Sequence, residues 1–176
     1  MNQDRLKQEF INAFGEDKWN EQEMLSKLMP IHKELCEYLG IEMVPVIFED
    51  IEEDSRFYFK EQYIVISKRM LPRYSDVLKS LVHEVRHGYQ YYCIFNPNNE
   101  DPRLVKNWKQ DLDKLINPLL MSDAELAGNY YLLNTLELDA HAFSKWYLKD
   151  KLDIETHYPQ FEYDYFLDMY IRKYFK

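Results

Sequence analysis

Apolar residues recur along the chain with two different periods, and the change of period divides it into predicted helices and strands. Steps of three and four residues are typical of amphipathic helices, and they run through residues 4–14, 20–39, 77–90, 103–115, 136–148 and 161–175. Pro30 interrupts the second of these and predicts a kink or a split there, while Gly40 marks its end. Ser122–Glu125 fits a capping box and predicts another helix start, with a break near Gly128.

Short runs rich in β-branched and aromatic residues predict three strands between the second and third helices. They cover Val44–Phe48, Arg56–Phe59 and Tyr63–Ser67. Lys60–Gln62 would form the turn that joins the last two strands in a hairpin. The predicted fold is therefore α+β, with a small antiparallel three-stranded sheet packed on the third helix and on several further helices. Residues 1–176 are interpreted as one domain, because the length suits a single core and no linker or repeat interrupts it.

The third predicted helix carries His83-Glu84-x-x-His87, with Ser75 placed to cap its start. Residues four apart lie on one face of a helix. Both imidazoles can therefore reach one tetrahedral Zn²⁺, and a glutamate directly after the first ligand is the general base of zinc peptidases. The alternative is a surface helix with two incidental histidines.

A catalytic zinc needs a third protein ligand, and the predicted helix at 136–148 offers three. Glu137 and His141 share a face, whereas Asp139 points away from both. Glu137 is the preferred ligand, with His141 and Asp139 as alternatives. If Glu137 binds the metal, these two would orient a ligand or stabilise an oxyanion, or else be a satisfied histidine and a solvated acid. Thr135 is placed to cap this helix.

Four more side chains have a candidate role near these motifs. Tyr130 and Tyr131 are candidate donors to an oxyanion, and Gln90 lies one helical turn beyond His87, where it would hydrogen-bond a ligand or substrate. Solvation on the helix surface is the alternative for Gln90. Arg86 is expected to pair with a surface acid.

Composition narrows the classes of function. A net charge of −9 and a sequence pI near 5.1 disfavour a nucleic-acid partner. No run approaches the roughly 18 apolar residues of a membrane span, and the first seven residues lack the apolar core of a signal peptide. We therefore expect a cytoplasmic protein with no membrane partner, in which Cys36 and Cys93 are free thiols.

The two motifs together resemble the ImmA/IrrE-type zinc peptidases, small gluzincins that occur often in phages and mobile elements. The resemblance spans about residues 40–148 and depends on His83-Glu84-x-x-His87 and on Glu137-x-x-Ala140-x-x-Phe143-Ser144. It implies a zincin-like fold, Zn²⁺ bound by His83, His87 and Glu137, and Glu84 as general base.

A zincin binds the main chain of its peptide along the edge strand beside the motif helix. We expect the strand Tyr63–Ser67 or its hairpin partner to take that role. Glu137 follows His87 by 50 positions, more than this resemblance predicts. Residues 96–121 account for the difference and would form a lid or a wall of the cleft.

The sequence thus predicts a zinc peptidase acting on a peptide or protein substrate, and two alternatives stay open. One is a non-catalytic interaction protein on a zincin scaffold, in which His141 or Asp139 closes the zinc site as a fourth ligand. The other is a metal-dependent hydrolase of a non-peptide substrate, because the motif specifies the nucleophile better than the bond it attacks.

Overall fold

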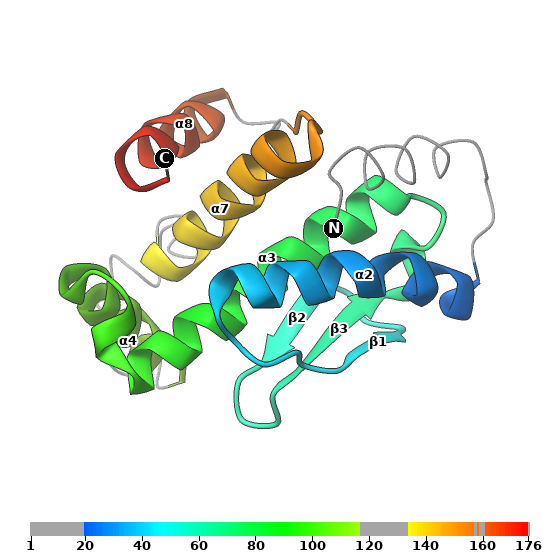
Figure 1. The fold of residues 1–176 in the computed structure, drawn as a ribbon, viewed down its shortest axis with the longest axis horizontal. Helices are drawn as coiled ribbons and strands as arrows, with labels where there is room; N and C mark the ends of the chain where they lie inside the picture. The colour runs from blue at the N-terminus through cyan, green and yellow to red at the C-terminus, as the bar shows by residue number, and fades with distance from the viewer. Residues whose placement is uncertain (1–19, 117–133, 157, 159–160, 176) are drawn as a thin grey trace.

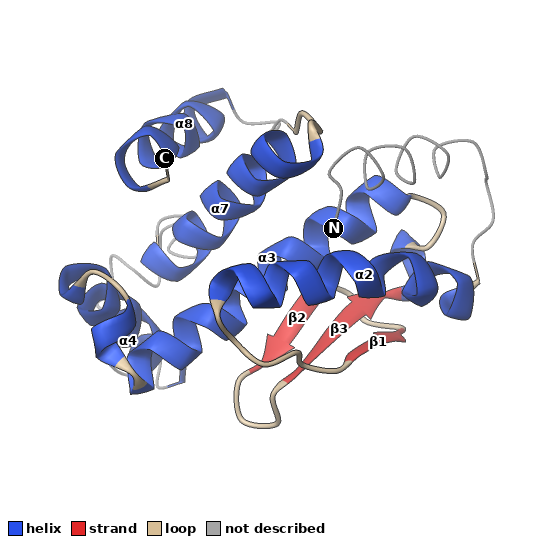
Figure 2. Ribbon diagram, in the orientation of Figure 1, coloured by secondary structure: helices blue, strands red, loops and turns tan. Residues whose placement is uncertain are grey.

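The computed structural model describes residues 20–116, 134–156, 158 and 161–175. These residues form a mixed α+β structure with five α-helices and one three-stranded sheet (Figures 1 and 2). The α-helices and strands are α2 Glu21–Leu39, β1 Val46–Glu49, β2 Ser55–Tyr58, β3 Tyr63–Ser67, α3 Tyr74–Phe95, α4 Pro102–Ile116, α7 Thr135–Leu152 and α8 Phe161–Tyr174. The helices predicted at residues 4–14 and after residue 122 lie outside the described residues.

Local signals at both ends define α2. Asn20 and Glu23 form a reciprocal capping box, in which the Asn20 side chain accepts from the Glu23 amide at 2.9 Å. Gly40 ends the helix in the left-handed region with φ 69°. The helix continues through Pro30 without a split, so that alternative is wrong.

The sheet has the strand order β1-β3-β2, with β1 parallel and β2 antiparallel to β3. The prediction of a wholly antiparallel sheet is therefore wrong, and β3 is the central strand rather than an edge. Its residues Ile64–Ser67 are all buried, whereas β1 and β2 each bury one residue. A continuous buried run takes the centre because it is covered on both faces and paired along both sides. The edges are β1 and β2.

The long helix α3 lies between the sheet and α7 (Figure 1). From Val77 to Gln90 every residue is buried except the half-buried Lys79. The helix begins at Tyr74, so Ser75 is its second residue and not its cap. No side chain caps this end; the buried ring of Tyr74 belongs to the hydrophobic core instead, so packing holds the first turn in place of a cap.

The helix α4 packs against α3 and α7 through buried Leu104, Val105, Trp108 and Leu112. It accounts for most of the predicted insertion at 96–121, whose last five residues lie outside the described part. The cap of α7 is Asn134, whose side chain accepts from the Glu137 amide at 2.7 Å. Thr135, predicted to be the cap, instead donates its hydroxyl to Asp111 at 2.6 Å.

The last helix, α8, packs on α7 (Figure 1). Its buried residues are Tyr163 and Leu167, and they contact Ala142 of α7. Tyr165, Phe166 and Met169 belong to the apolar stripe of this helix, but they are exposed. The apolar stripe of α8 is wider than the contact of this helix with α7, so packing buries only part of the stripe.

None of the described helices is long and apolar enough to cross a membrane. Cys36 and Cys93 are buried free thiols.

Candidate metal centre

Three potential metal ligands from two helices converge in the interior. His83 and His87 come from successive turns of α3, and Glu137 comes from the first turn of α7. His83 Nε2 lies 3.0 Å from His87 Nε2 and 3.3 Å from Glu137 Oε2, and His87 Nε2 lies 3.5 Å from Glu137 Oε1. All three side chains are buried. They form a group that could hold a metal ion, here called the triad.

The spacing of the triad fits a tetrahedral ion. Ligands about 2.0–2.1 Å from a tetrahedral metal lie about 3.3 Å from one another, close to the three distances observed. Glu137 Oε2 is buried without a hydrogen-bond partner in the described structure. A buried carboxylate oxygen needs such compensation, and a cation between the three groups would supply it.

Gln90 fixes the orientation of His87. Its side-chain oxygen lies 2.8 Å from His87 Nδ1 and accepts a hydrogen bond from the N–H group there. The other ring nitrogen, Nε2, is then the one that faces the triad with its lone pair free for a metal. Gln90 therefore hydrogen-bonds His87, the residue predicted to be a ligand, and its solvated alternative is wrong because Gln90 is fully buried.

Asp139 lies behind Gln90 and binds three side chains. It accepts from Gln90 Nε2 at 2.7 Å, from Arg86 Nε and Nη2 at 2.7 and 3.1 Å, and from the Tyr170 hydroxyl at 3.1 Å. Asp139 is therefore not a solvated acid, and Arg86 pairs with a buried acid instead of a surface one. The guanidinium also faces the rings of Tyr89, Trp108, Phe143 and Phe175. Asp139 points away from the triad, as the helical spacing predicts.

Glu84 sits beside the triad under the sheet. Its Oε1 lies 4.0 Å from His83 Nε2 and accepts a hydrogen bond from the Ser55 hydroxyl at 2.7 Å. Ser55 opens β2, the edge strand nearest α3. Phe57 lies beside Gly88 and Phe59 beside Tyr91, so β2 and its continuation run in the same direction as α3.

His141 flanks the triad on the opposite helix. Its Nε2 lies 3.9 Å from Glu137 Oε2, and its Nδ1 lies 2.6 Å from the hydroxyl of Tyr158. Among the described residues, only His83, His87 and Glu137 offer ligand atoms that all lie within 4.8 Å of one another, so His141 is outside that set. Tyr163 packs against both His141 and Tyr158, and its buried hydroxyl has no hydrogen-bond partner in the described structure.

The pKa values of Glu137 and of the two histidines beside it are shifted by burial and by one another's charges. Burial alone would lower the pKa of His87, but the carboxylate of Glu137 raises it to about 9. Burial acts on Glu137 in the other direction, yet the charge of His87 and the adjoining ring of His83 hold the pKa of Glu137 well below its usual range. Burial and the charge of His83 keep the pKa of His141 well below its ordinary value. The carboxylate of Glu137 therefore favours a positive charge at the centre of the triad.

Sequence reasoning missed three side chains next to the triad: Ser55, Tyr158 and Tyr163. Ser55 immediately precedes Arg56, where the second strand was predicted to begin, so the predicted strand missed it by one residue. Tyr158 and Tyr163 lie outside any local motif, and only the packing of α8 on α7 places them here. Tyr130 and Tyr131 lie outside the described residues.

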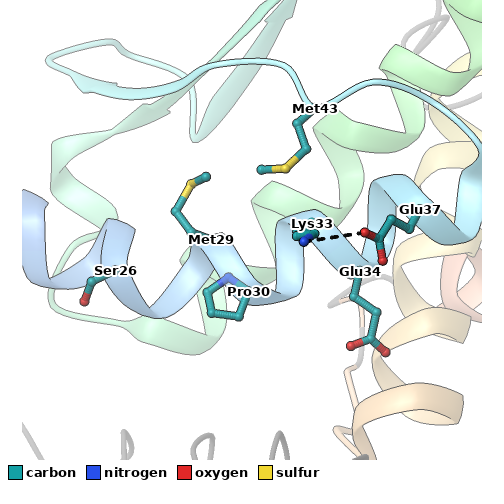
Figure 3. Close-up of a pocket in the computed structure, with 7 residues that line it drawn as sticks. All are labelled: Ser26, Met29, Pro30, Lys33, Glu34, Glu37 and Met43. Atoms are coloured by element: carbon teal, nitrogen blue, oxygen red, sulfur yellow. Dashed lines mark ion pairs between the residues drawn. The ribbon is translucent and has the colours of Figure 1, made fainter. Parts of the chain in front are cut away.

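A surface pocket of about 630 Å³ lies on α2 and includes none of the triad residues (Figure 3). It is lined by Ser26, Met29, Pro30, Lys33, Glu34, Glu37 and Met43. Lys33 and Glu37 form an exposed ion pair at 3.8 Å across one helical turn. Glu34 Oε2 is buried without a hydrogen-bond partner in the described structure, but no histidine or cysteine lines this pocket, so it lacks the converging ligand atoms of the triad.

The chain was compared with protein-family models, curated proteins and solved structures, and no match was found in any of the three comparisons.

Proposed function

We propose that this protein is a zinc-dependent peptidase with a zincin-like fold, of the ImmA/IrrE type that its two motifs resemble. The observation that carries the proposal is the buried His83, His87 and Glu137 triad with tetrahedral spacing and Glu84 at its side. The two nitrogens and one carboxylate are a ligand set of catalytic zinc, which keeps a further position open. Zinc held there would polarise a scissile carbonyl and acidify the attacking water.

Glu84 acts as general base and then as general acid in this mechanism. Its carboxylate accepts a proton from the attacking water and delivers it to the leaving amine. Ser55 donates to Oε1 and holds the side chain in place, which leaves Oε2 for the transferred proton. Gln90 keeps Nε2 of His87 directed at the ligand position throughout the reaction.

The oxyanion of the tetrahedral intermediate is stabilised by His141 and the tyrosines around it. With its pKa held low, His141 is neutral, and the Tyr158 hydroxyl donating to Nδ1 places the proton on Nε2, near Glu137. The unpartnered hydroxyl of Tyr163 lies in the same aromatic group. Preorganised donors of this kind contribute about 3–4 kcal/mol each to transition-state stabilisation.

The substrate main chain pairs with β2, the hairpin partner of β3. Because β3 is central, only β2 and β1 present an unpaired edge, and β2 is the edge beside Glu84. An antiparallel strand pairs slightly more stably than a parallel one, so we assign the peptide an antiparallel orientation on β2.

The test combines metal analysis with substitution of the base. Tag-free protein purified without added metal should contain about one zinc per chain, and His83→Ala should lose it. Glu84→Gln should retain zinc but reduce peptide hydrolysis by at least about 10²-fold, the lower limit for loss of a general base.

Each arm can contradict the proposal separately. No zinc in the wild type, and none bound on titration, would exclude the metal centre. Zinc with undiminished hydrolysis by Glu84→Gln would exclude the mechanism. Tight zinc with no cleavage of any peptide in a randomised library would favour the non-catalytic scaffold instead.

A further inference from the structure

Lys79 stands one helical turn before the first histidine of the triad. Residues four apart share a face of α3, and four residues advance a helix by about 6 Å, so Lys79 adjoins His83. Its ammonium lies 3.8 Å from the centre of the Tyr158 ring, whose hydroxyl is bonded to His141. The Ser144 hydroxyl of α7 donates to the Lys79 carbonyl at 3.2 Å and fixes its backbone. Lys79 is thus a cation at one end of the metal centre.

This cation has no hydrogen bond or ion pair within the part of the chain that the structure describes. Three carboxylates influence its charge from a distance, but each is paired with another base. The pairs are Asp54–Arg69 at 2.8 Å, Asp76–Arg73 at 3.0 Å and Asp164–Lys145 at 2.7 Å. Burial lowers the pKa of Lys79 because water solvates its ammonium incompletely. A bound anion would compensate that loss.

The direction of β2 decides which part of a substrate would reach Lys79. Ser55 of β2 contacts Glu84, and Phe57 lies farther along α3 beside Gly88. When a peptide pairs antiparallel to β2, its carboxyl-terminal part therefore points toward the start of α3. An extended chain advances about 3.4 Å per residue, so the first or second residue after the scissile bond lies level with Lys79.

We propose that Lys79 is a specificity-determining residue that binds a carboxylate on the carboxyl-terminal side of the substrate, within two residues of the scissile bond. The inference rests on the proposed function for the metal centre and for the orientation of the peptide. The anion is either an Asp or Glu side chain or the terminal α-carboxylate. In a chain with net charge −9, an acidic ligand is otherwise repelled, so a preference for one requires a specific cation.

The experiment measures binding, so that it needs no turnover. Four succinyl hydroxamates anchor on the zinc-loaded protein, and their succinyl unit takes the place of the first residue after the scissile bond. One pair continues with Asp-amide or Asn-amide as the second residue, and the other with Ala that ends in a free carboxylate or an amide. In the wild type at least one acidic member should bind about 10-fold more tightly than its neutral partner. Lys79→Gln should reduce that ratio to about 1, and Lys79→Arg should restore most of it.

Lys109→Gln is the matched control, because it removes an exposed lysine from α4 and should leave both ratios unchanged. Thermal melting of every variant confirms that the fold is intact. The Asp and free-carboxylate pairs distinguish a side chain from a terminus as the bound group. Equal affinity within both pairs in the wild type, or a preference that survives Lys79→Gln, would overturn this inference while the metal centre stands. Failure of all four to bind the zinc-loaded protein would exclude an open position on the zinc, and with it both the proposed peptidase function and this inference.

Discussion

Histidines in the described structure occupy two contrasting environments, one with side-chain partners and one without. His87 is held by Gln90 and Glu137, and His141 by Tyr158. His32, on α2, is more deeply buried than either of them, but neither of its ring nitrogens has a hydrogen-bond partner in the described structure. In the first environment, hydrogen bonds and a neighbouring charge orient the imidazole ring. In the second, burial without a partner only disfavours the protonated form of the ring.

We predict that His32 makes the fold sensitive to acid. Burial lowers its pKa from 6.5 to about 4, so below pH 6.5 the unfolded chain binds a proton that the folded one does not. This contribution to stability is complete above pH 6.5 and is lost as the pH falls toward 4. Between pH 7.5 and 5 the free energy of unfolding should fall by about 2 kcal/mol more in the wild type than in His32→Leu.

Urea unfolding at the two pH values measures the difference. Both proteins are studied in a chelator, so that metal release contributes to neither. Equal losses in the two proteins would show that His32 is protonated as readily in the fold as in the unfolded chain.

At the scale of elements, two glycines differ in backbone conformation: Gly88 lies inside α3, and Gly40 is the residue that ends α2. Gly88 is buried inside α3, and a Cβ there would meet the Phe57 ring at 3.7 Å and Ile41 at 3.8 Å, which are ordinary contact distances. Gly40 ends α2 with φ 69°, where a Cβ meets nothing within 4 Å. Space therefore permits alanine at both positions, and backbone conformation distinguishes them.

The two substitutions should change stability in opposite directions. Gly88→Ala should raise the free energy of unfolding by about 0.5–1 kcal/mol, because alanine loses less conformational entropy in a helix. Gly40→Ala should lower it by about 1 kcal/mol, because a side chain is disfavoured in the left-handed region. Denaturant unfolding of the two variants provides the comparison. A loss of stability in Gly88→Ala would mean that α3 and β2 approach more closely than these distances indicate.

Across the whole molecule, the carboxylate of Asp139 joins three helices. It belongs to α7, binds Arg86 and Gln90 of α3, and accepts from Tyr170 of α8. Arg86 in turn faces Trp108 of α4. The same group that aligns His87 through Gln90 therefore also holds the helical layer together, so stability and metal binding are coupled.

Asp139→Asn should weaken both properties together. Removing one charge leaves the buried guanidinium of Arg86 uncompensated, which costs about 3–5 kcal/mol. Asparagine also replaces one of the two acceptor oxygens with a donor, which disturbs the hydrogen bond to Gln90 and should reduce zinc affinity by about 10-fold or more. Denaturant unfolding and a competitive zinc titration measure the two effects.

Asp150→Asn is the matched control. Asp150 forms a half-exposed pair with Lys151 at 2.7 Å, so its loss should cost less than about 1 kcal/mol and leave zinc affinity unchanged. Should Asp139→Asn bind zinc as tightly as the wild type, Gln90 would not need Asp139 to hold it in place.

The sequence by itself determined those features that depend on neighbours along the chain. The periodicity predicted all five described helices, and the runs at residues 44–67 predicted the three strands, to within a few residues at their ends. The spacing of His83 and His87 placed both imidazoles on one face, and the spacing in α7 turned Asp139 away from Glu137. These relations follow from the geometry of a single helix or strand.

Only the tertiary structure decided what depends on distant segments. The central place of β3, the buried partner of Arg86, and the positions of Ser55 and Tyr158 beside the triad all come from contacts between segments that are apart in the sequence. A helical period shows which residues share a face, but not what lies opposite that face. The reason is physical: burial and pairing of a side chain are properties of the packed core, and packing is set jointly by segments far apart in sequence.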